Sequence, residues 1–223
     1  MSNWIVIPAY NEALRLPKVL RGLRERCSSI VVVDDGSSDQ TAAAALGNGA
    51  IVLRHLINRG QGAALRTGLQ FALERGATQI ITFDADGQHQ AEDISALLET
   101  LRTEQADLVV GSRFLGSAPG IPLHRWLTLK LAVIFTRLTT GLKLTDAHNG
   151  LRAMTSAAAA KLTFTEDGMA HASQILSMAA KLKLKVREVP CSIVYTKQSL
   201  EKGQPTSAAF RILGRLAISR LIR

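Results

Sequence analysis

The chain contains little cysteine, few aromatic residues and no long apolar run, and each shortage argues against a class of protein. Only two of its 223 residues are cysteines, and 4% are aromatic. The two cysteines lack metal or redox spacing, so we expect ordinary reduced residues and a reducing compartment. Few aromatic residues and no recognition motif argue against nucleic-acid binding, despite a pI near 10.1. No run approaches the roughly 20 apolar residues that span a bilayer, so we expect a soluble or peripheral protein.

Two common nucleotide-binding motifs are also missing. The segment Gly60-Gln61-Gly62 does not complete a Gly-x-Gly-x-x-Gly fingerprint, and no Gly-x-x-x-x-Gly-Lys-Ser/Thr loop occurs in the chain. A dehydrogenase and a P-loop protein therefore lack support. For the two glycines, packing at the start of a helix is the favoured interpretation, and backbone contact with a nucleotide is the alternative.

The sequence does contain a regular alternation of short apolar runs and helical patterns. Five runs that end in turn or polar residues are typical of buried strands: residues 5–7, 30–33, 51–53, 80–83 and 108–110. Between them, apolar residues at helical spacing and alanine-rich stretches predict helices. We therefore predict a single α/β domain over residues 1–206, with a mostly parallel sheet and helices on both of its faces.

Acidic side chains follow two of these predicted strands. Asp84 and Asp86 come directly after the run 80–83, and Asp35 follows the run 30–33. Open α/β folds bind ligands at the carboxyl edge of the sheet, where these side chains should lie. Mg²⁺ and Mn²⁺ prefer carboxylate and amide oxygens and usually share their coordination shell with substrate phosphates. The pair therefore predicts a divalent cation bound together with a nucleotide diphosphate, and a turn or helix cap is the alternative.

Positive charge is concentrated at the carboxyl-terminal end. Residues 181–223 hold ten Lys and Arg against two Glu, so they carry +8 of the formal net charge of +9. Within them, residues 207–223 predict a basic amphipathic helix that lies either on an anionic membrane surface or on the protein's own core. A second apolar stretch, residues 124–138, carries Trp126 and scattered cations. It predicts a helix in a membrane interface or an ordinary buried helix.

Several motifs, taken in order, resemble those of the family 2 glycosyltransferases. They are Ile5–Glu12, Val31–Thr41, Asn58–Gly68, Phe83–His89, Gly111–Arg113 and Asp146–Arg152. Within that family the chain most resembles the dolichyl- or polyprenyl-phosphate sugar synthases, over about residues 4–196. The resemblance implies the Rossmann-like GT-A fold and a metal-dependent, inverting hexosyltransferase. Its donor would be a UDP- or GDP-linked sugar, its cofactor Mg²⁺ or Mn²⁺, and its acceptor lipid-linked, most simply a polyprenyl phosphate.

The resemblance also implies roles for individual residues. Residues expected to line the nucleotide pocket are Pro8, Ala9, Tyr10, Glu12, Asp35 and Asp84. The residues expected at the cation are Asp84, Asp86 and Gln88. Arg113 is similar to a further phosphate-binding group, and an exposed arginine at a strand end is the alternative.

Asp146 and Arg152 belong to the acceptor side of the resemblance. If the acceptor is a sugar hydroxyl, an inverting enzyme needs a general base, and Asp146 is the candidate. If the acceptor is a polyprenyl phosphate, its oxygen is already ionised, no base is required, and Arg152 or Arg113 would position the phosphate. A loop-capping role for Asp146 is the alternative, and His148 is a weaker candidate.

The chain departs from the family pattern in two respects. Around residues 169–175 the family often carries an acidic residue, whereas this chain has Ala-His-Ala-Ser-Gln over residues 170–174. This departure leaves the acceptor and the sugar open. The longer synthases append transmembrane helices, so we expect access to the cytoplasmic face of the membrane through the two amphipathic stretches or a membrane partner protein. A transferase acting on a growing saccharide, and a nucleotide-sugar-binding subunit without turnover, are the alternatives.

Overall fold

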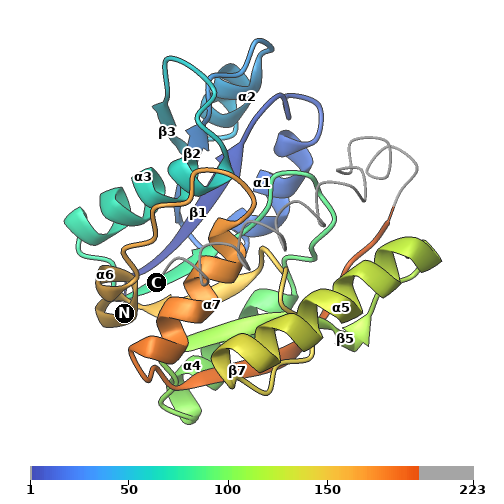
Figure 1. Ribbon diagram of the computed structural model, residues 1–223. Coiled ribbons are helices and arrows are strands. Elements are labelled where there is room, and N and C mark those ends of the chain that lie inside the picture. The colour runs from blue at the N-terminus through green and yellow to red at the C-terminus, as the bar shows by residue number, and fades with distance from the viewer. Residues whose placement is uncertain (1, 196–223) are drawn as a thin grey trace.

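The computed structural model describes residues 2–195, which form a seven-stranded sheet covered by helices (Figure 1). The strands are β1 (Asn3–Ala9), β2 (Ser29–Asp34), β3 (Ile51–Arg54), β4 (Gln79–Thr82), β5 (Leu108–Ser117), β6 (Arg152–Thr155) and β7 (Val186–Ser192). Their order across the sheet is β3-β2-β1-β4-β6-β5-β7. Among these strands only β6 runs antiparallel to its neighbours. The predicted α/β class with a mostly parallel sheet is confirmed.

Helices pack on both faces of the sheet, as predicted. One layer holds α1 (Leu16–Arg24), α2 (Thr41–Gly47) and α4 (Asp93–Thr103). The other holds α3 (Gln61–Glu74), α5 (Leu123–Thr140), α6 (Ser156–Lys161) and α7 (His171–Lys181). Alternate residues of β1 enter the two cores, with Ile5 and Ile7 in the first and Trp4 and Val6 in the second. Burial of both faces explains why the central strands β1, β2 and β4 appear in the sequence as unbroken apolar runs.

The order of the strands creates a switch point between β1 and β4. From β1 the chain passes through α1, on the first face, to β2. From β3 it returns through α3, on the second face, to β4, which pairs with the other side of β1. The loops that follow β1 and β4 therefore diverge, and this is where open α/β sheets leave room for a ligand.

The first turn of α3 packs tightly on the loop that precedes α7. The amide of Gly62 donates a hydrogen bond to the carbonyl of Asp167 at 2.7 Å. A Cβ atom at Gly60 or Gly62 would collide with the carbonyl oxygens of Asp167 and Glu166, and Gly60 has a φ of +102°. These contacts agree with the helix-start interpretation of the two glycines.

Two expectations concern membranes. Among the helices described between residues 2 and 195, none is long and apolar enough to span a membrane. The stretch 124–138 is helical, as predicted, and lies within α5. The predicted domain boundary at residue 206 and the basic helix over residues 207–223 lie outside the described residues.

Candidate active site

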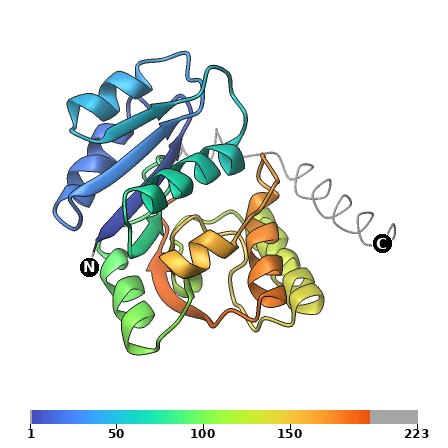
Figure 2. The same ribbon diagram turned by 90° about the vertical axis from the view of Figure 1, so that its left-hand side faces the viewer.

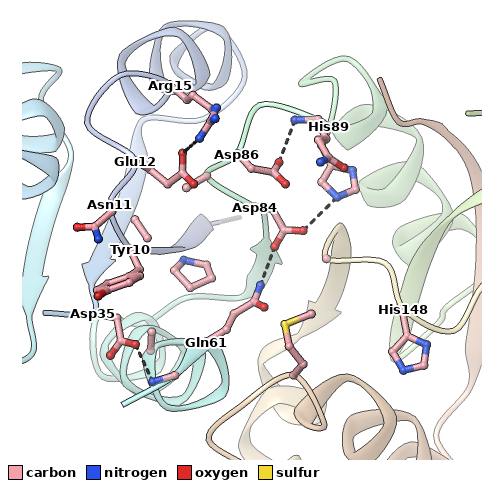
Figure 3. A pocket seen from close by; sticks show the side chains of 18 of the residues that line it. Tyr10, Asn11, Glu12, Arg15, Asp35, Gln61, Asp84, Asp86, His89 and His148 are labelled. Carbon is pink, nitrogen blue, oxygen red and sulfur yellow. Dashed lines mark hydrogen bonds and ion pairs between the residues drawn. The ribbon is translucent and has the colours of Figure 1, made fainter. Parts of the chain in front are cut away.

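A pocket of about 610 Å³ opens at the carboxyl ends of β1, β2 and β4 and beside β5 (Figure 3). Its size is typical of small-molecule sites, which span roughly 300–1,000 Å³. Figure 3 shows Tyr10 and Asp35 at one end, His148 at the other, and Asp84 between them. The predicted residues that line the pocket are Pro8, Ala9, Tyr10, Glu12, Asp35, Asp84, Asp86, Gln88 and Arg113. A cavity therefore opens at the sheet edge that the strand-end acids predict.

The loops after β1 and β2 are bound to each other at one end of the pocket. The amide of Asp35 donates to the carbonyl of Ala9 at 2.8 Å. In return, the amides of Asn11 and Glu12 donate to the hydroxyls of Ser37 and Thr41 at 2.9 and 2.8 Å. Because the two loops share these bonds, the pocket wall they form is fixed before any ligand arrives.

Asp35 is held on three sides and still has capacity for a ligand. Its carboxylate accepts hydrogen bonds from the amides of Arg59 at 3.0 Å and Gly60 at 2.7 Å, and Nδ1 of His55 lies 2.6 Å away. The other ring nitrogen of His55 lies 3.0 Å from the Thr67 hydroxyl, which orients the imidazole. A carboxylate has about four lone-pair sites, so one remains for a donor such as a ribose hydroxyl or a base N–H.

Asp84 lies in the middle of the pocket, between two side chains that orient it. Gln61 donates to its Oδ1 at 3.0 Å, and Nε2 of His89 lies 3.4 Å from its Oδ2 (Figure 3). Burial alone would raise the pKa of Asp84, but the His89 contact and the positive charge of Arg152 outweigh burial and lower it. Asp84 is therefore an anion at neutral pH. Gly150 packs directly against its carboxylate, where no side chain would fit.

Asp86 differs from Asp84 in that its pKa is raised and not lowered. Its Oδ1 accepts the amide of Gln88 at 2.9 Å. Burial and the negative charge of Asp84 raise its pKa to about 6. A carboxylate whose ionisation is opposed by a neighbouring carboxylate suits a bound cation, which would offset the repulsion.

The protein side chains do not form a complete cation site. Within residues 2–195, no three His, Cys, Asp or Glu side chains form a group that could hold a metal ion. Asp84, Asp86 and Gln88 would leave most of an octahedral shell to other ligands. Mg²⁺ usually binds in this manner, through one or two carboxylates plus water and substrate phosphates. The residues present therefore fit a cation that arrives with a diphosphate.

Arg113 lines the pocket from β5 and is buried, with 6% of its surface exposed. Its Nε lies 2.6 Å from Oδ2 of Asp146, and its two terminal nitrogens donate to the Tyr195 hydroxyl and the His148 carbonyl, each at 2.6 Å. Burial opposes its charge, but Asp146 outweighs burial and holds the pKa of Arg113 above its ordinary value. A guanidinium has five N–H donors, so two remain for an anionic ligand. The alternative of an exposed strand-end arginine is wrong.

The structure does not bring Asp146 and Arg152 to the pocket wall. Asp146 is fully buried and accepts hydrogen bonds from the Arg113 amide at 3.2 Å and from its Nε, while its own amide donates to Glu188 at 2.9 Å. Arg152 is 1% exposed on β6, and its Nε and Nη1 have no hydrogen-bond partner within residues 2–195. Of the four residues considered on the acceptor side, Arg113 and His148 line the cavity, and Asp146 and Arg152 do not.

The positive charge on the acceptor side comes from arginine and not from histidine. His148 lines the pocket and its Nε2 lies 3.0 Å from the Ser173 hydroxyl. Burial, together with the charges of Arg152 and Arg113, lowers the pKa of His148 to about 4, so the imidazole is neutral at pH 7. Arg125, which sequence reasoning did not single out, also lines the pocket, and its guanidinium stacks 5.0 Å from the centre of the Tyr195 ring.

Other residues of the pocket wall were not predicted as site residues. The most polar of them are Asn11, Arg15, Asn58, Gln61 and His89. Most of them lie in the motif segments that carry the family resemblance. The sequence could therefore have placed them near the pocket, but we assigned them no role. Arg15 forms an ion pair with Glu12 at 2.7 Å. The spacing of three residues between these opposite charges could have predicted this contact.

Comparison with known proteins agrees with the resemblance. Residues 4–162 match the sequence model of the family described as glycosyl transferase family 2. The UDP-N-acetylglucosamine–dolichyl-phosphate N-acetylglucosaminyltransferase of Methanococcus voltae is 32% identical, over 98% of this chain and 96% of that protein. The undecaprenyl-phosphate mannosyltransferase of Micrococcus luteus is 39% identical, over 66% of this chain and 64% of that protein.

Among solved structures, the chain is similar to glucosyl-3-phosphoglycerate synthase from Mycobacterium tuberculosis, crystallised with Mn²⁺ and UDP-glucose. The TM-score is 0.74 over 99% of this chain and 78% of that one, at 18% sequence identity. The likeness confirms the predicted GT-A fold. A match over most of the chain and a relative aligned along nearly its whole length lead to one conclusion: the chain belongs to glycosyl transferase family 2.

Proposed function

We propose that this protein transfers a sugar from a nucleotide diphosphate sugar to a polyprenyl phosphate. The observation that carries the proposal is the placement of the carboxylates Asp84 and Asp86 and the buried guanidinium of Arg113 on the wall of one pocket. The carboxylates suit a cation bound to a diphosphate, and the guanidinium suits a second anion. The two relatives named for dolichyl phosphate and undecaprenyl phosphate support an acceptor of this class.

On the donor side, the first loop and Asp35 would bind the nucleoside, and Asp84, Asp86 and Gln88 would hold Mg²⁺ or Mn²⁺. When bound, the cation would neutralise the negative charge that develops on the departing diphosphate. Gln61 and His89 would keep the Asp84 carboxylate in one orientation, because they contact its two oxygens separately.

On the acceptor side, Arg113 would bind the acceptor phosphate with its two remaining N–H groups. An ionised phosphate oxygen then attacks the anomeric carbon, the bond from that carbon to the donor phosphate oxygen breaks, and its electron pair leaves with the nucleoside diphosphate. Inversion at the anomeric carbon accompanies a single displacement. No general base is needed, so Asp146 serves as a positioning residue that holds Arg113.

Nucleotide binding gives the first test. UDP or GDP is expected to stabilise the protein in the presence of Mn²⁺, by about 2.7 kcal/mol at a ligand concentration of 100 times the dissociation constant. Thermal unfolding with each nucleotide, with and without EDTA, measures the effect. The corresponding nucleoside monophosphate is the control, because it lacks the diphosphate. If no nucleoside diphosphate raises the melting temperature, the proposal fails. If the protein binds nucleotide but releases no nucleoside diphosphate from a sugar donor when any polyprenyl phosphate is supplied, it is a subunit without turnover.

Asp146 gives a second test, which separates positioning from base catalysis. Replacing Asp146 by Ala leaves the buried Arg113 charge without its partner and should lower the free energy of unfolding by about 3–5 kcal/mol. The milder Asp146→Asn keeps a neutral acceptor, so it should raise the KM for polyprenyl phosphate more than it lowers kcat. Denaturant unfolding and steady-state kinetics measure the two effects.

The control for this pair is Asp167→Asn, which removes an exposed carboxylate that pairs with Arg66. Because this ion pair is exposed, its loss should change the free energy of unfolding far less than Asp146→Ala does. A collapse of kcat in Asp146→Asn, with the acceptor KM unchanged, would reject the positioning role.

A further inference from the structure

Helix α5 buries one side and leaves the opposite side apolar and exposed. Its buried residues are Ala132, Val133 and Thr136. The exposed residues, which we call the α5 stripe, are Leu123 (72%), Leu127 (49%), Leu131 (50%), Ile134 (54%) and Leu138 (81%). Their spacings of four and three residues place them on a single helix face, about 22 Å long at 1.5 Å per residue.

The α5 stripe is a continuous surface and not a set of scattered leucines. Figures 1 and 2 show α5 side by side with α7, at the outer edge of the molecule. Because each stripe residue is at least 49% exposed, no element within residues 2–195 covers this face. Single exposed leucines are ordinary on a protein surface, but a row of five on one helix marks an interaction surface.

The charge of α5 identifies the kind of surface it suits. The helix contains no Asp or Glu, and its basic residues are His124, Arg125, Lys130 and Arg137. The Lys130 ammonium lies 3.7 Å from the centre of the Phe114 ring and 5.6 Å from that of Trp126, at the border of the stripe. An apolar face with basic and Trp borders suits a bilayer interface with anionic headgroups. A second copy of the chain would instead bring like charges together.

The first turn of α5 also borders the acceptor side of the pocket. Arg125 lies on the pocket wall, and it stacks on Tyr195, whose hydroxyl accepts a hydrogen bond from Arg113. We propose that the α5 stripe docks the protein on the surface of an anionic lipid bilayer, with α5 lying along the interface. This orientation would bring the Arg113 side of the pocket close to the headgroup layer. The identity of the acceptor rests on the proposed function, whereas the docking does not.

The test uses the full chain and protein-free vesicles of phosphatidylcholine with phosphatidylglycerol. The triple variant Leu127→Gln, Leu131→Gln, Ile134→Gln should partition about tenfold or more weakly than the wild type, because three apolar side chains no longer enter the interface. The matched control, Leu14→Gln with Leu56→Gln, changes two residues that are 96% and 101% exposed and lie outside α5, and should bind as the wild type does. Vesicles of phosphatidylcholine alone should bind the wild type less well.

Four results would overturn the docking. They are equal binding by the triple variant and the wild type, equal losses in the triple variant and the control, no wild-type binding to protein-free vesicles, and a concentration-dependent dimer that the triple variant abolishes. A thermal melt shows whether the triple variant folds. If it does not fold, the single variant Leu131→Gln is used instead, and its expected loss of vesicle binding is smaller. Failure of the wild type to transfer sugar to any polyprenyl phosphate would reject the proposed function and leave the vesicle result standing.

Discussion

Asp86→Asn is expected to lower metal-dependent sugar transfer by about 10²–10³-fold, the effect typical of losing one group that stabilises charge in the transition state. The substitution removes one of the two carboxylates proposed to hold the cation and leaves an amide of nearly the same shape. Steady-state transfer with Mn²⁺ measures the loss, and calorimetric titration of Mn²⁺ with UDP or GDP shows whether cation binding is lost with it.

The same substitution should leave the fold intact. Burial and the charge of Asp84 raise the pKa of Asp86 to about 6, so ionised Asp86 at pH 7 destabilises the folded, metal-free protein relative to the unfolded chain. Removing that charge should not lower the free energy of unfolding without metal. Glu92→Gln, which removes a charge from an exposed carboxylate, controls for the change in net charge. Near-normal transfer by Asp86→Asn, or unchanged Mn²⁺ binding, would reject the proposed cation site.

The first five strands and the acidic loops could be predicted because the signals are local. A parallel strand buried on both faces is a short unbroken apolar run, and the residue after it lies at the carboxyl edge of the sheet. Asp35 and Asp84 reach the pocket for this reason. The second half of the chain gave weaker signals. β6 has only four residues, and it runs antiparallel between β4 and β5, so no alternation of strand and helix indicates its place.

The acceptor side was predicted less well because its geometry depends on contacts between distant segments. Arg113 and Asp146 are separated by the whole of α5, and nothing in their spacing shows that they form a buried ion pair. For the same reason, composition alone could not decide whether the stretch 124–138 is buried or exposed. The structure shows that it is both, with one face in the core and the α5 stripe facing outward.

Gly150→Ala is expected to lower transfer by about 10²-fold, although the residue has no side chain to take part in the reaction. A Cβ atom at this position would collide with the Asp84 carboxylate. The backbone cannot easily give way, because the Gly150 carbonyl accepts a hydrogen bond from the Thr82 hydroxyl at 2.7 Å. Asp84 must therefore leave the orientation set by Gln61 and His89, and a displacement of about 1 Å at a reacting centre can cost 10²-fold in rate.

The effect of Gly150→Ala should come from this collision and not from backbone strain, because its φ is not in the left-handed region. Overpacking should cost about 1–3 kcal/mol of stability, which denaturant unfolding measures separately from the kinetics. Gly47→Ala is the matched control: its φ also lies outside the left-handed region, and among the described residues no atom beyond its own helix backbone and chain neighbours lies within 4 Å of the added Cβ. It should leave transfer unchanged. If Gly150→Ala binds the donor and turns over as the wild type does, the orientation of Asp84 is not what the pocket requires.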